Sequence, residues 1–407
     1  MKQVAILPDV LDHIVIDRSG KDPRYIAVSH TKKYMRISPR AYTLLEKVHA
    51  GHSFTAIAQD LNRGRERTVA PEEVQKAYEQ ICTKISKIES EKETKDRSFW
   101  FKLPVISASN VQEIASACTF MFHPLVALVA LSSIGLLATY AIVSGLTTHV
   151  SANPPFMIIP AYLLFLLSLF AHEFGHGSAC LKGGVEPSEI GVAVYLFFPV
   201  FYSDVSASWQ LTRWQKVRVD VAGVYFQLCV GGIYLLLFIV TREALFQWAI
   251  LMLLSSCLLS INPFLKFDGY WVLTDMLGVS NLFKQPTYLL GYFYQTRIQK
   301  RQQTLRWSPG VCIVILLYSA GKIAFWGYLL LAFLPALYKA IALYPAQIEN
   351  MLAHLSQYGT HLLLTDLQIL AANGIIIVLY GGGIYRICTP WIKQLFVRKV
   401  VPETLVQ

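Results

Sequence analysis

Charged side chains are scarce in this sequence of 407 residues: they make up 15% of the chain, whereas soluble domains carry about 25%. The deficit is uneven. Residues 1–100 hold an ordinary mixture of Lys, Arg, Asp and Glu, and long apolar runs begin near Cys118. This distribution argues against a single soluble domain. It predicts a mainly α-helical, multi-pass membrane protein with a small soluble N-terminal domain.

Paired cysteines are also missing. The seven cysteines are scattered, and most lie in apolar runs, so we expect reduced thiols rather than disulfides or a cysteine metal site. The N-terminus lacks an apolar run long enough for a signal peptide, which predicts a cytoplasmic first domain. The net charge of +10 does not indicate nucleic acid, because basic residues of the second half lie between apolar runs, as the positive-inside rule expects.

Six segments approach the roughly 20 apolar residues that a membrane-spanning helix needs. They are 121–146, 155–180, 219–240, 245–266, 309–336 and 367–387. Loops rich in Lys and Arg alternate with loops that contain few of them. The alternation predicts six spans with both termini in the cytoplasm.

The N-terminal segment predicts a small α+β domain. Two strand-like runs lie within residues 24–38 and are joined by a polar turn. Ser38 and Ser53 are each followed by a helical pattern, and a third helix is expected over 71–98. A β-hairpin with three helices is typical of a winged helix. A regulatory, dimerisation or DNA-binding domain is an alternative, but the helices lack the concentrated basic face that DNA binding needs.

The stretch HEFGH at 172–176 contains the residues that predict a metal-binding catalytic site. On a helix, His172 and His176 lie one turn apart on the same face, so both can bind one Zn²⁺. Glu173 is rotated away from them but can take a proton from water at the metal. Ionisable groups at bilayer depth cost roughly a few kcal/mol each on insertion scales, and a metal would compensate. One buried histidine bonded to a carbonyl is the structural alternative.

A catalytic zinc ion needs a third protein ligand, and the candidate is Asp268 in the segment SINPFLKFDGYW. Asn262 and Pro263 interrupt the helix before it, which is tolerated where backbone lines a cavity or is buried in protein. The alternative is that Asp268 pairs with Lys266 or caps a helix. The run at 187–209 is apolar, strand-like and short for a span, so we expect a membrane-entering hairpin or an interfacial strand.

Two resemblances follow from these motifs. The segment YIAVSHTKKYMRISPRAYTLLEKVHAG resembles the PqqD-like recognition elements of ribosomally made peptide (RiPP) pathways, over residues 8–90. The membrane half resembles the site-2 protease family of intramembrane zinc metalloproteases, through HEFGH, DVAGVYFQL at 220–228 and NPFLKFDGYW at 262–271. It is most similar to bacterial peptide zinc metalloproteases that carry a fused PqqD-like domain.

The second resemblance implies site roles. In that family two histidines and an aspartate bind one zinc ion and a glutamate activates water, roles that fall on His172, His176, Asp268 and Glu173. It further implies substrate contacts, which fall on Asn262, Gln227 and Gly223. Many members have Asn at the position of Gln227, so the placement of this longer amide is in question.

The resemblances together imply a domain order: a PqqD-like domain at 1–98, a linker at 99–120, a protease domain at 121–390 and a tail at 391–407. They imply a metalloendopeptidase of the bacterial inner membrane with its N-terminus in the cytoplasm. Its partners would be membrane lipid, a substrate peptide with a leader bound by strand addition, and an exporter or periplasmic adaptor. The alternatives are a non-proteolytic, zinc-stabilised export or immunity component, and regulated proteolysis of a membrane regulator.

Overall fold

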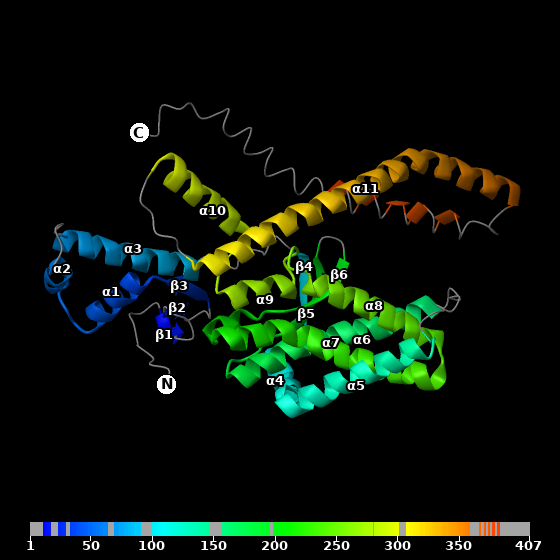
Figure 1. Cartoon of the computed structure of the whole chain (residues 1–407), viewed down its shortest axis with the longest axis horizontal. Coiled ribbons are helices and arrows are strands. Elements are labelled where there is room, and N and C mark those ends of the chain that lie inside the picture. The colour runs from blue at the N-terminus through cyan, green and yellow to red at the C-terminus, as the bar shows by residue number, and fades with distance from the viewer. Residues whose placement is uncertain are drawn as a thin grey trace. The chain divides into compact units, whose positions relative to one another are not determined.

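The computed structural model describes residues 11–17, 23–29, 33–63, 69–90, 99–146, 157–195, 198–279, 281–300 and 307–358, with short pieces between 366 and 382. These residues are mostly helical (Figure 1). They fall into two units. The first unit ends at Tyr288 and omits 194–198, and the second holds 194–198 with the residues from Leu289 onward.

The N-terminal part of the first unit is an antiparallel sheet packed against helices. Its strands, which pair in chain order, are β1 (Leu11–Asp17), β2 (Arg24–Ser29) and β3 (Tyr34–Ile37). Its helices are α1 (Pro39–His49), α2 (Phe54–Asn62) and α3 (Pro71–Ser90). The hairpin of β2 and β3 and the three helices were predicted from the sequence, whereas β1 was missed.

Local chemistry explains where the first two helices begin. The side chains of Ser38 and Ser53 accept hydrogen bonds from the backbone N–H groups of Ala41 and Ala56. These bonds satisfy donors that have no partner within the helix. Ile14 of β1 and Leu45 of α1 are almost fully buried in the core between sheet and helices.

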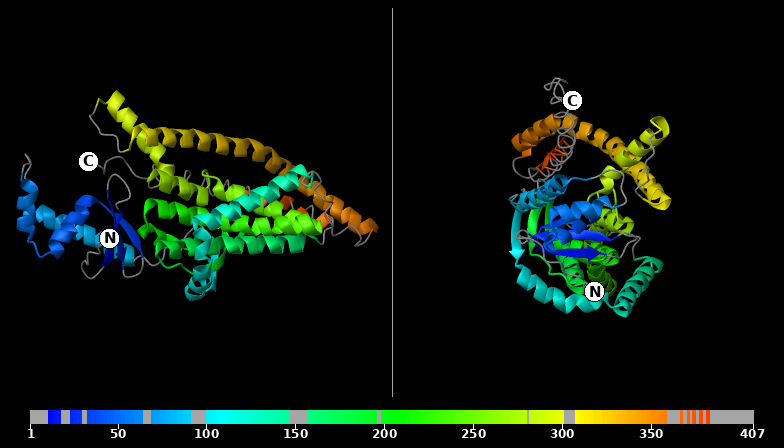
Figure 2. Two further views of the ribbon diagram at one scale, coloured as in Figure 1. Left: turned by 60° about the horizontal axis from the view of Figure 1, so that its bottom comes forward. Right: turned by 90° about the vertical axis from the view of Figure 1, so that its left-hand side faces the viewer.

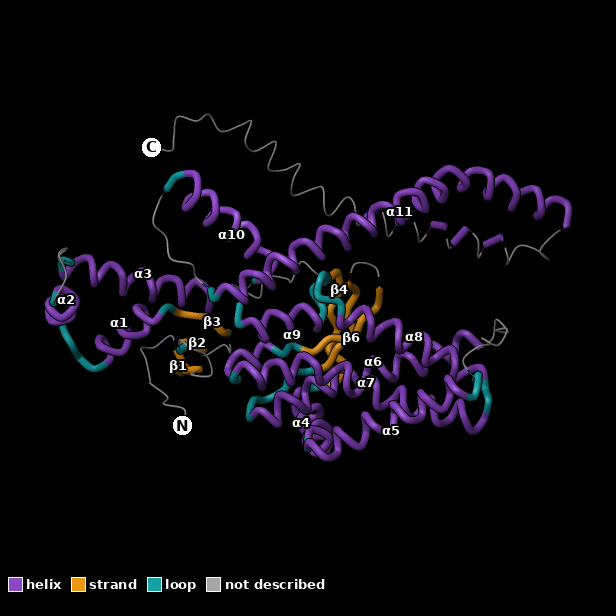
Figure 3. Tube along the Cα trace, in the orientation of Figure 1, coloured by secondary structure: helices purple, strands orange, loops and turns teal. Residues whose placement is uncertain are grey.

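A second sheet was only partly foreseen. Residues 99–120, expected to be a linker, form β4 (Phe99–Ile106), α4 (Ala108–Cys118) and the first half of a 3-10 turn (Thr119–Phe122). β4 pairs with β5 (Ile190–Tyr195), which pairs with β6 (Phe198–Ser203), so the strands of Figure 3 form two groups. The predicted strands at 187–209 are present. β4 was missed because strand pairing with a distant segment leaves no local signal.

Within the part of the chain that the structure describes, five helices are long and apolar enough to cross a membrane. They are α5 (Pro124–Val143), α6 (Ile158–Gly183), α7 (Arg213–Thr241), α8 (Ala244–Ile261) and α11 (Pro309–Tyr358). In the first unit α6 and α7 pack along each other, and the left view of Figure 2 shows the green helices of this unit lying side by side. The predicted sixth span at 367–387 lies largely outside the described residues.

Shorter helices connect these elements. They are a 3-10 turn (Ser206–Gln210), α9 (Asp268–Leu277), a second 3-10 turn (Leu282–Lys284), α10 (Gln285–Phe293) and a π-helical turn (Tyr294–Ile298). The six cysteines within the described residues are free thiols, in agreement with the expectation of reduced cysteines.

Helix α11 corrects the predicted end of the fifth span. We expected that span to end near residue 336, but the helix continues to Tyr358 with Pro335 and Pro345 inside it. Its 50 residues extend for about 75 Å, against roughly 30 Å for the hydrocarbon core of a bilayer. Proline removes one hydrogen bond and bends a helix. In α11 the two prolines do not end the helix.

Candidate metal centre

Helix α6 brings the two histidines of the HEFGH stretch together. His172 and His176 are separated by one helical turn, so both rings leave the same face. Both residues are buried, with relative exposures of 7% and 6%. The two Nε2 atoms lie 3.1 Å apart. Two imidazole nitrogens therefore point at one buried position.

Asp268 reaches this position because the chain breaks after α8. That helix ends at Ile261, and α9 starts at Asp268 after a short turn. The next residue, Gly269, makes the close return of the chain sterically feasible, since a Cβ there would lie 1.8 Å from the carbonyl oxygen of Ile261. The Asp268 carboxylate lies 3.0 Å from Nε2 of His172 through Oδ2 and 3.6 Å from Nε2 of His176 through Oδ1.

The three side chains form a group that could hold a metal ion, with one ligand atom each and all within 4.8 Å of one another. Zinc bonds of about 2.0–2.1 Å in a tetrahedral site place ligand atoms about 3.3 Å apart. The two Nε2 atoms are 3.1 Å apart, and the nearest oxygens of Asp268 lie 3.0 Å (Oδ2) and 3.6 Å (Oδ1) from them, all close to this value. Two imidazoles and one carboxylate also leave a fourth position open, as catalytic zinc requires.

Gly223 of α7 shows that this space is kept clear. A Cβ at Gly223 would lie 2.4 Å from Nε2 of His172 and 2.6 Å from Nε2 of His176. A methyl group there would therefore sit against both candidate ligand atoms. The predicted role of Gly223 in substrate binding is untested, but its position explains the absence of a side chain facing the histidines.

Hydrogen bonds behind the ligands set which ring nitrogens carry hydrogen. Nδ1 of His176 lies 2.8 Å from the carbonyl oxygen of Val219. A carbonyl oxygen can only accept, so Nδ1 of His176 donates and Nε2 keeps its lone pair. Nδ1 of His172 lies 3.1 Å from Oε1 of Gln227. Gln227 is therefore placed behind His172.

Asp268 is oriented beside the two histidines by a neighbouring hydroxyl. Ser260 donates a hydrogen bond of 2.8 Å from its hydroxyl to Oδ2. An oriented carboxylate beside two imidazoles suits a divalent cation. Among the ion pairs of the described residues, Asp268 pairs with the two histidines and not with Lys266, whose ammonium lies 5.4 Å from the ring centroid of Phe283.

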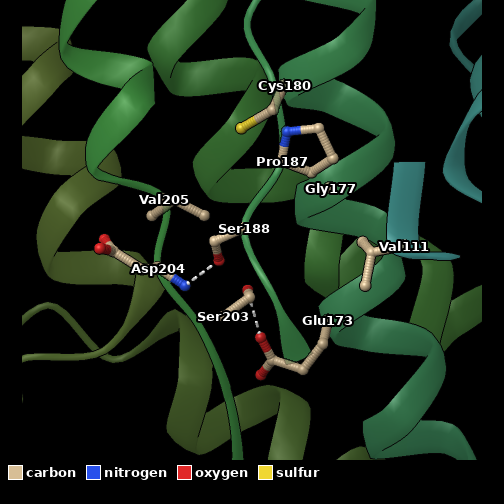
Figure 4. Close-up of a pocket in the computed structure, with 9 residues that line it drawn as sticks. All are labelled: Val111, Glu173, Gly177, Cys180, Pro187, Ser188, Ser203, Asp204 and Val205. Carbon is tan, nitrogen blue, oxygen red and sulfur yellow. Dashed lines mark hydrogen bonds between the residues drawn. The ribbon is translucent and has the colours of Figure 1, made fainter. Parts of the chain in front are cut away.

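Glu173 points to a different side of α6. The hydroxyl of Ser203, the last residue of β6, donates to Oε2 of Glu173 at 2.6 Å (Figure 4). The carboxylate lines a small pocket with side chains from α4, α6 and the loops around the second sheet, as Figure 4 shows. The second sheet and the proposed general base are thus joined by a direct hydrogen bond.

Asn262 takes a local role in the structure. It is the C-cap of α8, and its Oδ1 accepts a hydrogen bond of 2.9 Å from the backbone N–H of Phe264. The bond shapes the turn that leads to Asp268. The predicted substrate contact of Asn262 remains a prediction, since this side chain is not part of the three-residue group.

Sequence reasoning missed the serines around the site. Ser203 contacts Glu173, Ser260 contacts Asp268, and Ser168 with Ser256 contacts Gln227. Serine is frequent in any chain, and no spacing links these positions to the ligands. Only Ser260 lies close in sequence to its partner, eight positions before it, so a sequence signal existed only there.

Comparison with known proteins gives one distant similarity. The protein named "Putative peptide zinc metalloprotease protein YydH" of Bacillus subtilis (strain 168) is 27% identical over 126 residues, which is 30% of this chain. The match covers 50% of that protein, so the chain spans about half the length of the curated relative. No family model matches the chain. No solved structure matches it.

Proposed function

We propose that this protein is a membrane-embedded zinc metalloendopeptidase of the site-2 protease type. The observation that carries the proposal is the convergence of His172, His176 and Asp268 within 4.8 Å, with Glu173 on the same helix as the two histidines. The name of the distant relative, a peptide zinc metalloprotease, supports the same class. A purely structural metal site has no use for a carboxylate next to its first ligand.

Each residue has a defined task in peptide hydrolysis. When bound, a zinc ion supplies a Lewis acid that makes water acidic near neutral pH and polarises a carbonyl. His172, His176 and Asp268 hold it. Glu173 takes the proton of the attacking water and gives it to the leaving amine, as a general base and then a general acid. Ser203 keeps the Glu173 carboxylate in one orientation through its 2.6 Å hydrogen bond.

The substrate is a membrane-associated peptide. The histidines belong to α6, and Asp268 follows α8, and both helices are among those able to cross a membrane. A peptide must be extended before its amide is reachable, and pairing with the edge of a sheet satisfies its freed backbone groups. β6 offers such an outer strand in the described sheet, and its last residue contacts Glu173.

The N-terminal domain recruits this peptide by a leader segment. Its described sheet ends in β3, an outer strand to which an extended peptide can add. Recruitment to the same chain raises the effective concentration of substrate at the site. The function is then the maturation of a ribosomally made peptide at the bacterial inner membrane, with the N-terminus in the cytoplasm and an exporter or periplasmic adaptor as partner.

The test compares cells with the wild-type protein and cells with Glu173→Gln. Membrane and secreted peptides are profiled by mass spectrometry, and zinc is measured in both purified proteins. We expect a peptide shortened only by the wild type, with equal zinc in both, because Glu173 does not bind the metal. Identical peptide profiles together with an identical phenotype would overturn the peptidase and favour a non-proteolytic component.

A further inference from the structure

Gln227 lies beside the candidate metal centre, on the Nδ1 edge of the His172 ring. The side chain is fully buried, with a relative exposure of 0%. It sits on α7, one turn after Gly223 and therefore on the same face of that helix. Gly223 faces the Nε2 atoms of the histidines, whereas Gln227 contacts Nδ1 on the other edge of the His172 ring.

The hydrogen bonds around Gln227 fix which way its amide points. Its Nε2 lies 3.4 Å from the hydroxyl of Ser168 and 3.5 Å from that of Ser256. The Ser168 hydroxyl already donates its hydrogen to the carbonyl oxygen of Phe165, at 2.7 Å. It can therefore only accept from the amide. The amide nitrogen points to the two serines, which leaves Oε1 for His172.

This orientation decides the tautomer of His172. Oε1 can only accept, so Nδ1 of His172 must donate, and its Nε2 then keeps a free lone pair. A reversed amide would donate to Nδ1 and leave a hydrogen on Nε2, directed at Asp268 and the metal position. Such a ring could not bind a metal through Nε2.

We propose that Gln227 is a positioning residue that fixes the tautomer and ring orientation of His172 for metal binding. The inference rests on the zinc site of the proposed function and assigns this amide a role different from substrate contact. Partners of this kind behind a metal-binding histidine change metal affinity by about 10–100-fold when they are altered. The serines in turn position Gln227.

The test measures zinc affinity of the full chain in detergent, by competition with a chelator, in the Glu173→Gln background. Inactive protein makes the measurement independent of peptide cleavage. Gln227→Met keeps the length and volume of the side chain but removes the acceptor, so we expect zinc to bind about 10–100-fold more weakly. Gln227→Glu restores an acceptor at the same reach, and its affinity should return to within about tenfold of the parent.

Tyr234→Phe is the matched control. The Tyr234 hydroxyl donates to the carbonyl oxygen of Leu164 at 2.9 Å, so this change also removes one buried bond between α6 and α7. This bond does not involve either histidine, so the zinc affinity of the variant should stay at the parent value. Equal weakening by Tyr234→Phe would show a general packing effect and overturn the inference.

Peptidase assays of the single variants in active protein separate the remaining outcomes. If Gln227→Met binds zinc like the parent and raises only KM, the amide contacts substrate and the inference is wrong. If zinc binds more weakly to Gln227→Met and recovers in Gln227→Glu but the wild type cleaves no peptide, the positioning role holds and the proposed peptidase fails. A wild type that binds no zinc would overturn both.

Discussion

Replacing Gly223 with alanine tests the metal centre most directly. The added Cβ would lie 2.4 Å from Nε2 of His172 and 2.6 Å from Nε2 of His176. Ordinary contacts of a Cβ begin near 3.4 Å, so the rings and α7 must separate by about 1 Å. Metal ligands tolerate displacements of only about 0.2 Å.

The expected loss follows from this mismatch. Both ligand nitrogens are displaced. This perturbation is larger than the loss of a hydrogen-bond partner behind a ligand, which lowers metal affinity by about 10–100-fold. We expect zinc affinity to fall by at least about 100-fold, equal to roughly 2.7 kcal/mol. The fold should survive, because the gain of about 1 kcal/mol from alanine in a helix offsets part of an overpacking cost of about 1–3 kcal/mol.

The assay is zinc content and chelator competition on purified protein, with circular dichroism to follow unfolding. Gly231→Ala is the control on the same helix, since its Cβ would meet the end of the flexible Leu253 side chain at 3.2 Å. It should keep the zinc affinity of the wild type. A Gly223→Ala protein with wild-type zinc affinity would refute the assignment of this space to a metal.

Three further changes have distinct expected results. Asp268→Asn removes the anionic ligand, so zinc affinity should fall at least about tenfold. Ser260→Ala removes one hydrogen bond of about 1 kcal/mol and should lower zinc affinity only about fivefold. Equal effects would argue against Asp268 as a ligand. Ser203→Ala removes a charge-assisted hydrogen bond of roughly 1.5 kcal/mol to the Glu173 carboxylate, so kcat should fall about tenfold while the zinc content stays unchanged. A parallel loss of zinc would contradict the role of Ser203 in orienting Glu173. Leu45→Ala should destabilise the N-terminal domain by about 2–5 kcal/mol. Amide hydrogen exchange should then become faster in residues 11–90 and stay unchanged in residues 157–183. Faster exchange in both regions would mean that they unfold together.

The sequence predicted those features whose signal is local. Apolar runs gave the spanning helices, and the four-residue spacing of His172 and His176 gave the two-histidine face. Asp268 was predicted because a helix break and a glycine mark it within one short segment. In each case the residues that reveal the feature lie within a few positions of one another.

Features made by distant segments could not be predicted. Pairing of β4 with β5 joins segments on either side of α5 and α6, and nothing in FWFKLPVI shows where its partner lies. The contact between the Gln227 amide and His172 also joins distant segments. It depends on how α7 packs on α6, which helical periodicity alone does not specify. The predicted substrate contact of Gln227 stays a prediction.

The break after α8 has a consequence for the order of assembly. His172 and His176 lie on α6, but Asp268 follows only after α7 and α8 have been made. In a chain that is synthesised and folds from its N-terminus, the proposed ligand set stays incomplete until those helices and the turn at Asn262 have formed. Under the proposed function, zinc binding is then a late event, and a precursor that stops before α9 carries both histidines but lacks the third candidate ligand.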